Sequence, residues 1–531
     1  MATHIIQRRD LLAGAAATGA LSLLPLDLHG TSRAADDGWN AGLVAHLLPT
    51  VSHDRILLKA SFHEPLKEIP FLHVGGRPIV GERTDREGFF WQFDAAGLEP
   101  SRPYALVLTD ARGRPLCDEW PLTTFPAADD QPKQLRLLIF TCAGGHDGLG
   151  KHLPVSTRVR LLRRGLSFRP DAIIANGDHV YWDLRTRRGN QSGSSAEAAV
   201  IAGRFDRTAP VLGSPNEAVL KKAVGPQIVP LYAALCRSTP VFFMQDDHDY
   251  FENDEADDRF ISFPPDAFMM AAGRASQHLY YPEFLPDPMR PLGLASASAA
   301  DRPPRVSESY GTLRYGRLAE VLMYDCRRHL TMHGPSAVFV PPEVEAWLKD
   351  RMARPDTAHV INIPSTPPGW SAGKWGEWYA DMEADGGVTT AKPKPYWQPG
   401  WRAQHDRLLQ AASAMRGRIP LFISGDLHAI GETRISATGG MDLKQNPVTS
   451  VLSGPLGTAG YGWPSFFRGT RGMTPAGLTV DEVQPTIKEN GFLILDLTPE
   501  SMTLRFFKWR YDPVERIDAL EPFRTTQLKR S

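Results

Sequence analysis

The chain has 531 residues, 42% of them apolar, which is enough to bury one large core or two unequal ones, and we expect more than one domain. The 59 lysines and arginines balance the 60 acidic residues, which argues against a nucleic-acid footprint or an anionic-membrane surface. Four cysteines without C-x-x-C spacing argue against a disulfide framework.

The first 35 residues have the pattern of an export signal. Arg8 and Arg9 precede a small-residue apolar run over 11–25, and two alanines at 34–35 offer a cleavage site. The pattern predicts a twin-arginine signal over 1–35, use of the twin-arginine translocation machinery, and a periplasmic or secreted protein. The alternative is a retained anchor, although a run of about fifteen residues is short for a bilayer. We expect no transmembrane segment in the mature chain, and we expect a bound metal, because this route exports proteins that are already folded.

Residues 36–128 show short alternating apolar runs broken by turn residues. Two examples are residues 56–62 and 104–108. This spacing predicts a small β-sandwich of about ninety residues that carries no chemical cluster. A second domain follows over 129–531.

The pattern changes from residue 135 onward to short, wholly apolar runs that end in polar or acidic residues. These runs cover residues 135–140, 172–175, 241–244, 321–324 and 421–424. Continuous apolar strands are covered on both faces, and groups at their carboxyl ends converge at one edge of a sheet. The sequence therefore predicts an α/β domain with its chemistry at that edge.

The remaining stretches are less regular. An alternating hairpin is expected over 492–497 and 502–507, and the stretches 262–304 and 367–401 are predicted to be long and irregular. The second stretch is rich in aromatics: Trp370, Trp375, Trp378, Tyr396, Trp397 and Trp401. We interpret it either as a lid over the site or as a surface loop packed on itself.

The first chemical motif is Gly-Asp-His-Val-Tyr at 177–181. Asp178 follows a strand, and Tyr181 comes three residues later, so both side chains can face one ion. A carboxylate and a phenolate suit trivalent iron or an oxygen-seeking divalent ion. The alternative is that Asp178 caps a following helix.

Two further motifs follow later strands. The run Asp-Asp-His-Asp at 246–249 would be repulsive without cations between its carboxylates, unless it is a solvated acidic loop. Asp426 and His428 alternate, so in an extended segment they would point to the same side. The alternative for this pair is a capping aspartate and an unrelated core histidine.

The order of these motifs resembles a known family. Cys142, Gly-Asp-x-x-Tyr, Asp-Asp-His-Asp, Tyr-Asp-x-Arg at 324–327 and Gly-Asp-x-His at 425–428 are similar to the PhoD-like alkaline phosphatases and phosphodiesterases. These are relatives of purple acid phosphatases within the calcineurin-like metallophosphoesterases. The resemblance implies a four-layer αββα core preceded by a fibronectin-like sandwich, with a helix over 342–348.

The resemblance also implies ligands and cofactors. Fe³⁺ would be held by Cys142, Asp178, Tyr181 and His428. Asp178 would bridge to Ca²⁺ or another divalent metal that is held by Asp247 and Asp426. Asp246 would support either metal or a nearby calcium. A buried thiol is the alternative for Cys142, and His146 with Asp147 could add ligands or cap a helix. Cys326 and Gln245 depart from the family pattern, which puts the substrate pocket in doubt.

The implied activity is hydrolysis of phosphomonoesters, phosphodiesters or both, by attack of a metal-bridging hydroxide between cations about 4 Å apart. His248 would protonate the leaving alkoxide, and Arg327 or Arg328 would neutralise a phosphoryl oxygen, unless these arginines lie at the surface. The alternative functions are a catalytically silent metal-, phosphate- or glycan-binding scaffold of the same fold, and an iron oxidoreductase.

Overall fold

The computed structural model describes residues 38–147, 151–182, 202–250, 265–287, 310–331, 334–371, 381–382, 388–389, 399–467 and 471–530. The predicted export signal lies outside these residues. No helix in the described ranges is long and apolar enough to cross a membrane. All described residues belong to one unit, Arg33–Ser531.

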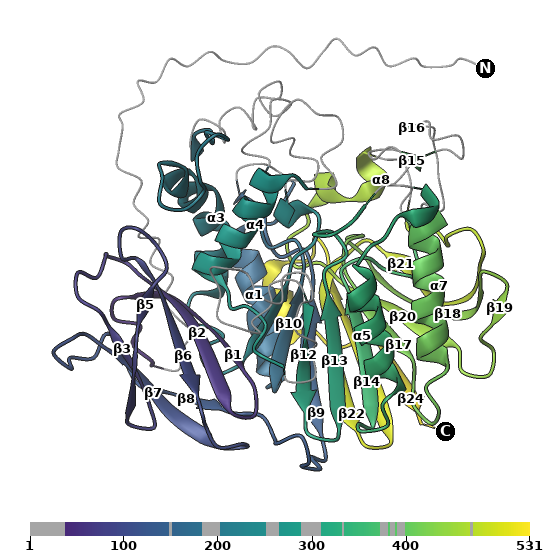
Figure 1. Cartoon of the computed structure of the whole chain (residues 1–531), viewed down its shortest axis with the longest axis horizontal. Coiled ribbons are helices and arrows are strands. Elements are labelled where there is room, and N and C mark those ends of the chain that lie inside the picture. The colour runs from purple at the N-terminus through teal and green to yellow at the C-terminus, as the bar shows by residue number, and fades with distance from the viewer. Residues whose placement is uncertain are drawn as a thin grey trace, which may run out of the picture. The chain divides into compact units, whose positions relative to one another are not determined.

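The N-terminal part contains two antiparallel four-stranded sheets (Figure 1), with the orders β1-β2-β6-β5 and β4-β3-β7-β8. The strands are β1 Val44–Val51, β2 Arg55–Phe62, β3 Phe71–Val74, β4 Arg77–Val80, β5 Glu82–Arg83, β6 Phe90–Ala96, β7 Pro103–Thr109 and β8 Trp120–Thr123. The strands predicted over 56–62 and 104–108 are confirmed. Buried residues of both sheets, such as Leu58 and Leu106, belong to one apolar cluster.

A six-stranded sheet follows, with the order β11-β10-β9-β22-β23-β24. Its strands are β9 Leu135–Phe140, β10 Ala172–Asn176, β11 Val241–Met244, β22 Asn490–Thr498, β23 Ser501–Trp509 and β24 Arg524–Lys529. The first three are parallel to one another, and the C-terminal hairpin pairs antiparallel with β9. The predicted strands and the predicted hairpin are therefore confirmed.

An eight-stranded sheet has the order β12-β13-β14-β17-β20-β18-β19, with β21 paired to β18. Its strands are β12 Tyr310–Tyr315, β13 Ala319–Tyr324, β14 His359–Pro364, β17 Leu421–Ser424, β18 Ile430–Thr438, β19 Met441–Asp442, β20 Val448–Ser453 and β21 Leu478–Ile487. Its central strands β13, β14, β17 and β20 are parallel. A separate short pair joins β15 Asp381–Met382 to β16 Val388–Thr389.

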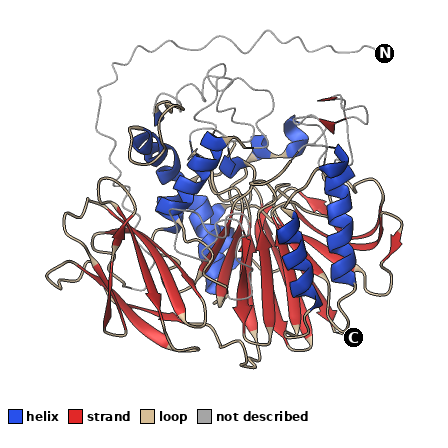
Figure 2. Ribbon diagram, viewed as in Figure 1, coloured by secondary structure: helices blue, strands red, loops and turns tan. Residues whose placement is uncertain are grey.

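The helices cover the sheets on both sides of a shared core (Figure 2). They are α1 Val155–Ser167, α3 Asn216–Tyr232, α4 Ala267–Tyr280, α5 Pro342–Ala353, α7 Pro399–Ser413 and α8 Pro464–Phe467, with shorter helices η4 His248–Tyr250, η5 Gly334–Ser336, η6 Gly460–Gly462 and η7 Val514–Ala519. Ile139 of β9 and Val321 of β13 share one cluster, while Leu138 packs with α1, α3 and α4 and Leu322 packs with α5 and α7. The wholly apolar runs are thus buried on both faces, as predicted.

Both stretches that were predicted to be irregular contain helix. α4 lies within 262–304, because Asp266 accepts the backbone N–H of Phe268 and Met269 and so caps a helix whose apolar face is buried. In 367–401, Trp401 belongs to α7 and donates its Nε1–H to the carbonyl of Thr331 at 2.8 Å. The prediction of an irregular segment is wrong at these positions, and most of the predicted lid lies outside the described residues.

Candidate metal centre

The chemical motifs occupy equivalent places at the ends of four strands. Cys142, Asp178, Asp246 and Asp426 each stand two residues beyond the last residue of β9, β10, β11 and β17, respectively. The first three strands belong to the six-stranded sheet and β17 belongs to the eight-stranded sheet. The two sheets therefore contribute to one group of side chains.

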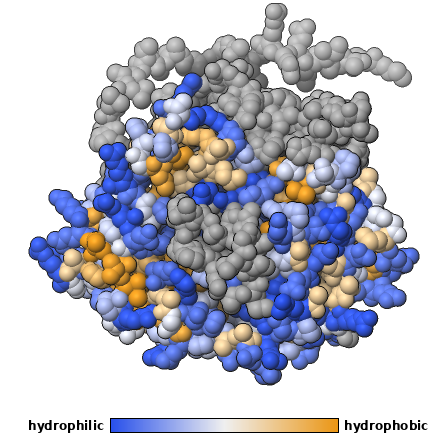
Figure 3. Space-filling model, viewed as in Figure 1, coloured by the Kyte–Doolittle hydropathy of each residue, from blue (hydrophilic) through white to orange (hydrophobic). Residues whose placement is uncertain are grey.

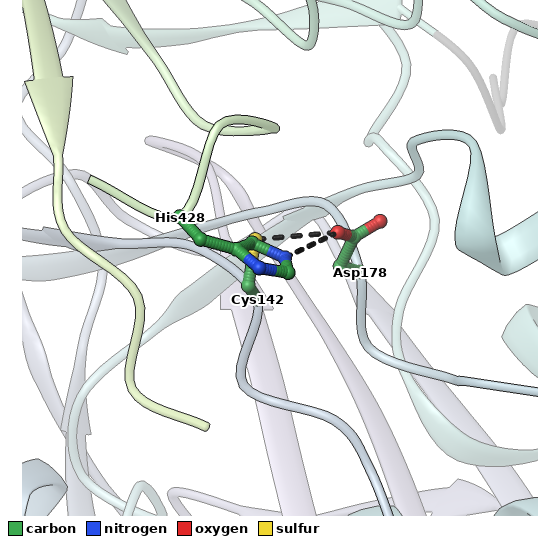
Figure 4. A group of neighbouring side chains, drawn as sticks. All are labelled: Cys142, Asp178 and His428. Carbon is green, nitrogen blue, oxygen red and sulfur yellow. Dashed lines mark hydrogen bonds and ion pairs between the residues drawn. The ribbon is translucent and has the colours of Figure 1, made fainter. Parts of the chain in front are cut away.

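Asp178 is the centre of the first group (Figure 4). Its Oδ2 lies 3.2 Å from the Cys142 Sγ and 3.7 Å from the His428 Nε2. The Tyr181 hydroxyl donates to the same oxygen at 3.0 Å and lies 3.0 Å from the His428 Nε2. The structure thus brings together the four side chains that the family resemblance assigns to iron. Of these, Cys142, Asp178 and His428 have ligand atoms within 4.8 Å of one another.

Asp178 also belongs to a second group with Asp246 and Asp247, whose carboxylate oxygens lie within 4.8 Å of one another. All three side chains are buried. Asp178 Oδ1 and Asp246 Oδ2 are buried with no hydrogen-bond partner among the described residues. Because a buried carboxylate oxygen without a partner is costly, this donor set fits cations on both sides of Asp178. We call Cys142, Asp178, Tyr181, Asp246, Asp247 and His428 the metal cluster.

The protonation of Cys142 and Tyr181 bears on which metal the first group can hold. Burial first, and then the charge of Asp178, raise the pKa of the Cys142 thiol and of the Tyr181 hydroxyl well above their usual values. A bound cation reverses this tendency, because it favours the thiolate and the phenolate. The group therefore fits a strong Lewis acid better than it fits a weakly held ion.

Asp426 and the two arginines are placed differently from the metal cluster. Arg327 is fully buried, donates its Nε–H to Asp246 Oδ1 at 2.6 Å, and holds Asp426 Oδ2 at 3.0 Å from its Nη2. Arg328 is 6% exposed. The surface alternative is therefore wrong for both arginines. Asp426 lies against a guanidinium and is not part of either three-residue group.

The backbone at this edge is strained. Cys142, Asp178, Asp426 and His428 have φ angles of 48°, 56°, 67° and 48°, and they make up four of the eight non-glycine residues with positive φ in the described ranges. Such residues cluster at functional sites, where surrounding structure holds them in place.

The expectation of an extended segment at 425–428 is wrong. The Leu427 N–H donates to the Gly425 carbonyl at 2.8 Å, which makes a tight turn centred on Asp426. The physical reason is a close approach between the two sheets, because a Cβ at Gly425 would lie 2.1 Å from the Thr141 Oγ1. Asp426 and His428 therefore reach the cluster from a turn.

Asp249 is a positioning residue that sequence reasoning did not assign. Its Oδ2 accepts the N–H of Asp178 and of Asp246, both at 2.9 Å, and its Oδ1 accepts those of His179 at 3.0 Å and Val180 at 3.1 Å. It therefore ties the loop after β10 to the loop after β11. The only signal in the sequence is its place at the end of the Asp-Asp-His-Asp run.

Gln227 of α3 is a second unassigned residue. Its Oε1 accepts the N–H of Tyr181 at 2.9 Å and of Gly145 at 2.7 Å, and its Nε2 donates to the Tyr181 carbonyl at 2.9 Å. A buried glutamine inside a helix gives no signal of this role. It fixes the loop that carries Tyr181.

The remaining predicted residues surround the cluster. The His248 ring lies 4.2 Å from the Tyr181 ring, measured between centroids. Asp147 accepts the N–H of Val155, the first residue of α1, and pairs with Arg158 at 2.8 Å, which supports its helix-terminus role.

The two departures from the family pattern are both buried outside the two metal groups. The Gln245 Nε2 donates to the Gly273 carbonyl of α4 at 2.9 Å, and the Cys326 N–H donates to the Ser365 Oγ at 2.9 Å. Both residues are thus engaged in packing.

Comparisons with known proteins place this geometry in a known fold. No model of a protein family matches the chain, and no curated protein matches its sequence. A solved structure of PhoD matches with a TM-score of 0.58 and 12% identity, over 94% of this chain and 92% of that chain. A purple acid phosphatase, PPD1 from seeds of yellow lupin (Lupinus luteus), matches with a TM-score of 0.54 and 12% identity, over 91% and 74%. The chain therefore shares the mixed α/β fold of these two proteins.

Proposed function

We propose that this chain, with its PhoD-like metallophosphoesterase fold, hydrolyses phosphate esters at a pair of metal ions. The observation that carries the proposal is the position of Asp178, which belongs both to the group with Cys142 and His428 and to the group with Asp246 and Asp247. One buried carboxylate shared by two cation positions fits a two-metal site of the kind that hydrolyses phosphate esters.

The donor chemistry supports different metals on the two sides of Asp178. Thiolate, phenolate and imidazole from Cys142, Tyr181 and His428 suit Fe³⁺. Carboxylates alone suit Ca²⁺ or another divalent cation, held by Asp247 with Asp246 and Asp426. When bound, such cations supply the Lewis acidity that activates a water molecule and binds a phosphoryl oxygen.

Side chains of the protein would supply the remaining steps, which are protonation of the leaving group and neutralisation of a phosphoryl oxygen. His248, beside the Tyr181 ring, is proposed to protonate the leaving alkoxide. Arg328 is proposed to neutralise a phosphoryl oxygen, because the guanidinium of Arg327 already holds Asp246 and Asp426. Arg327 is then a positioning residue for these two carboxylates.

The finer features belong to the same proposal. We propose a four-layer αββα core with a fibronectin-like sandwich before it, activity on phosphomonoesters and phosphodiesters, and export through the twin-arginine machinery to the periplasm or the medium. The two N-terminal four-stranded sheets and the core shared between the two larger sheets support the architecture. The paired arginines Arg8 and Arg9 support the route.

The test is the metal content of protein exported by its native host, measured by elemental analysis together with a visible absorption spectrum and turnover of 4-nitrophenyl phosphate. We expect iron and a second metal, chelator-sensitive turnover, and a charge-transfer band that Tyr181→Phe removes. The matched control is Tyr232→Phe, since that hydroxyl is buried without a hydrogen-bond partner among the described residues.

Two other outcomes would decide against parts of the proposal. Metal-loaded, coloured protein without turnover of mono- or diesters would support the silent binding scaffold. Colourless, metal-free protein from cells replete in iron and calcium would rule out the iron assignment.

A further inference from the structure

Exposed aromatic side chains gather in one place on the described surface. Across the described residues, five large apolar or aromatic side chains are exposed. Two of them, Ile69 and Val80, belong to the N-terminal part of the chain. The other three are Tyr461, Phe466 and Tyr511, which are 60%, 62% and 66% exposed. Figure 3 shows apolar residues at several places on one face of the molecule, among them the region of the N-terminal sheets. Ile69 and Val80 are aliphatic residues of the N-terminal part, whereas the three aromatic residues come from the C-terminal part of the chain.

The three aromatic residues are neighbours. The rings of Tyr461 and Phe466 meet edge to face with centroids 4.6 Å apart. Tyr511 comes from a distant part of the chain, and its hydroxyl lies 2.7 Å from where a Cβ would stand on Gly460. We call Tyr461, Phe466 and Tyr511 the aromatic rim.

The segment that carries this rim also lines the metal cluster. After β20, the Gly457 N–H donates to the Cys142 carbonyl at 2.8 Å. The Gly462 carbonyl lies 2.7 Å from the His428 Nδ1, which donates to it because a carbonyl only accepts. This bond leaves the Nε2 of His428 to face Asp178. Tyr461 is therefore adjacent in sequence to the residue that orients a candidate metal ligand.

The guanidinium of Arg510 lies beside the aromatic rim. The Arg510 guanidinium lies 4.9 Å from the ring centroid of Trp463 and 4.8 Å from that of Tyr511, and its Nη1 donates to the Lys488 carbonyl at 2.6 Å. Two cation–π contacts and one hydrogen bond fix its position. A fixed positive charge beside exposed rings is complementary to an anionic ligand with a flat organic group.

We propose that the aromatic rim is a subsite for the organic group of the phosphate ester, and that it selects esters whose leaving group carries a planar aromatic ring. This inference rests on the proposed function. Aromatic side chains bind flat rings through their faces, which gives affinity without a specific hydrogen-bond pattern. Tyr461 precedes Gly462, whose carbonyl accepts from the His428 Nδ1, so one short segment carries part of the rim and orients a candidate metal ligand.

The test compares two esters and two pairs of substitutions. For Tyr461→Ala combined with Phe466→Ala, we expect the KM for 2-naphthyl phosphate to rise about tenfold, with kcat unchanged. Both constants for glycerol 3-phosphate should stay at the wild-type values, since this ester has no ring. Tyr461→Phe should keep the wild-type KM, because it keeps the ring. The matched control is Ile69→Ala combined with Val80→Ala, which removes exposed apolar side chains from the sandwich and should change neither ester.

Several outcomes would overturn the subsite. An unchanged KM for 2-naphthyl phosphate, or equal losses on both esters, would do so. Unchanged KM values together with lost binding to phosphatidylcholine vesicles would assign the rim to a membrane surface. If the wild type hydrolyses neither ester, the proposed function fails, and calorimetric binding of 2-naphthyl phosphate still tests the subsite. In that case the subsite predicts that the wild type binds 2-naphthyl phosphate more tightly than inorganic phosphate. The double variant should bind the two ligands equally well.

Discussion

Two buried polar clusters in this molecule differ in how their charges are compensated. The Lys59 cluster lies where the N-terminal sheets meet α4, and it comprises Lys59, His46, Gln92, Glu283 and the last carbonyls of α4. The Lys59 Nζ donates to Gln92 Oε1 at 2.6 Å, to the His278 carbonyl at 2.9 Å and to Glu283 Oε1 at 3.3 Å. An ammonium group has three protons, so each proton has an acceptor.

The metal cluster is compensated differently. Asp178 Oδ1 and Asp246 Oδ2 are buried without a hydrogen-bond partner among the described residues, and Asp178 sits on a strained backbone. A buried charge that is satisfied by the chain's own groups thus stabilises the fold. Carboxylate oxygens that are left over instead provide binding capacity for an added cation, at a cost in stability.

The largest effect should come from Asp178→Asn, which tests whether the buried carboxylate of Asp178 binds cations at a cost in stability. We expect kcat/KM to fall about 10⁴-fold, equivalent to roughly 5 kcal/mol, because both cation positions lose their shared ligand. The chelator-treated variant should resist urea as well as the chelated wild type or better, since a buried charge is removed. Asp129→Asn, at a side chain 94% exposed, is the control. A variant that keeps both metals and its rate would contradict the role of Asp178.

Lys59→Met tests whether the Lys59 cluster stabilises the fold. The substitution leaves Glu283 buried without this cation, so the free energy of unfolding should fall by about 3–5 kcal/mol in urea denaturation. The folded fraction should keep the wild-type kcat. Adding Glu283→Gln should recover part of the stability, because the uncompensated charge is then gone. If kcat of the folded protein fell as well, the two clusters would not be separable.

Asp249→Asn sharpens the contrast, because Asp249 lies beside the metal cluster but is itself satisfied. An amide nitrogen cannot accept two of the four backbone N–H bonds that Asp249 now accepts. We expect activity to fall about 100-fold at limiting metal and to recover with excess iron and calcium, because the ligands remain but are less well oriented.

The control for this prediction is Asp147→Asn, which alters a contact at the start of α1. An Asp249→Asn variant that folds, as judged by circular dichroism, but stays inactive at saturating metal would show that Asp249 does more than position the two loops.

The sequence predicted the strands and the polar residues that follow them, because both signals are local. Cys142, Asp178 and Asp246 each stand two or three residues after an apolar run. Roles that depend on distant elements could not be predicted. Arg327 pairs with Asp246 across 81 positions of the chain, and no short pattern encodes that distance.

The turn at Asp426 was also missed, because it results from contact between the two sheets at Gly425 and Thr141. The apolar period of α4 was obscured by the Pro- and Gly-rich composition around it. The ligand roles themselves stay predictions until metals are measured.

The smallest effect should be a pH dependence from His46 in the Lys59 cluster. Its Nε2 donates to the Tyr280 carbonyl at 2.8 Å, and burial, helped by the charge of Lys59, lowers the pKa of His46 to about 4. The unfolded chain takes up this proton near pH 6.5, so the stability from neutral His46 is complete above pH 6.5 and is lost as the pH falls towards 4. From pH 7 to pH 5 this amounts to about 2 kcal/mol.

His46→Gln keeps a donor for Tyr280 but cannot titrate, so its unfolding free energy should lose less between pH 7 and pH 5 than that of the wild type. His73→Gln in β3 is the control for replacing a histidine elsewhere in the N-terminal sheets. Equal slopes in all three proteins would contradict the burial of a neutral His46. If the Lys59 cluster serves the fold and the metal cluster serves the proposed chemistry, the pH profile of kcat/KM should be the same in His46→Gln and in the wild type. A shifted profile would mean that the contact between the N-terminal sheets and α4 also acts on the metal cluster.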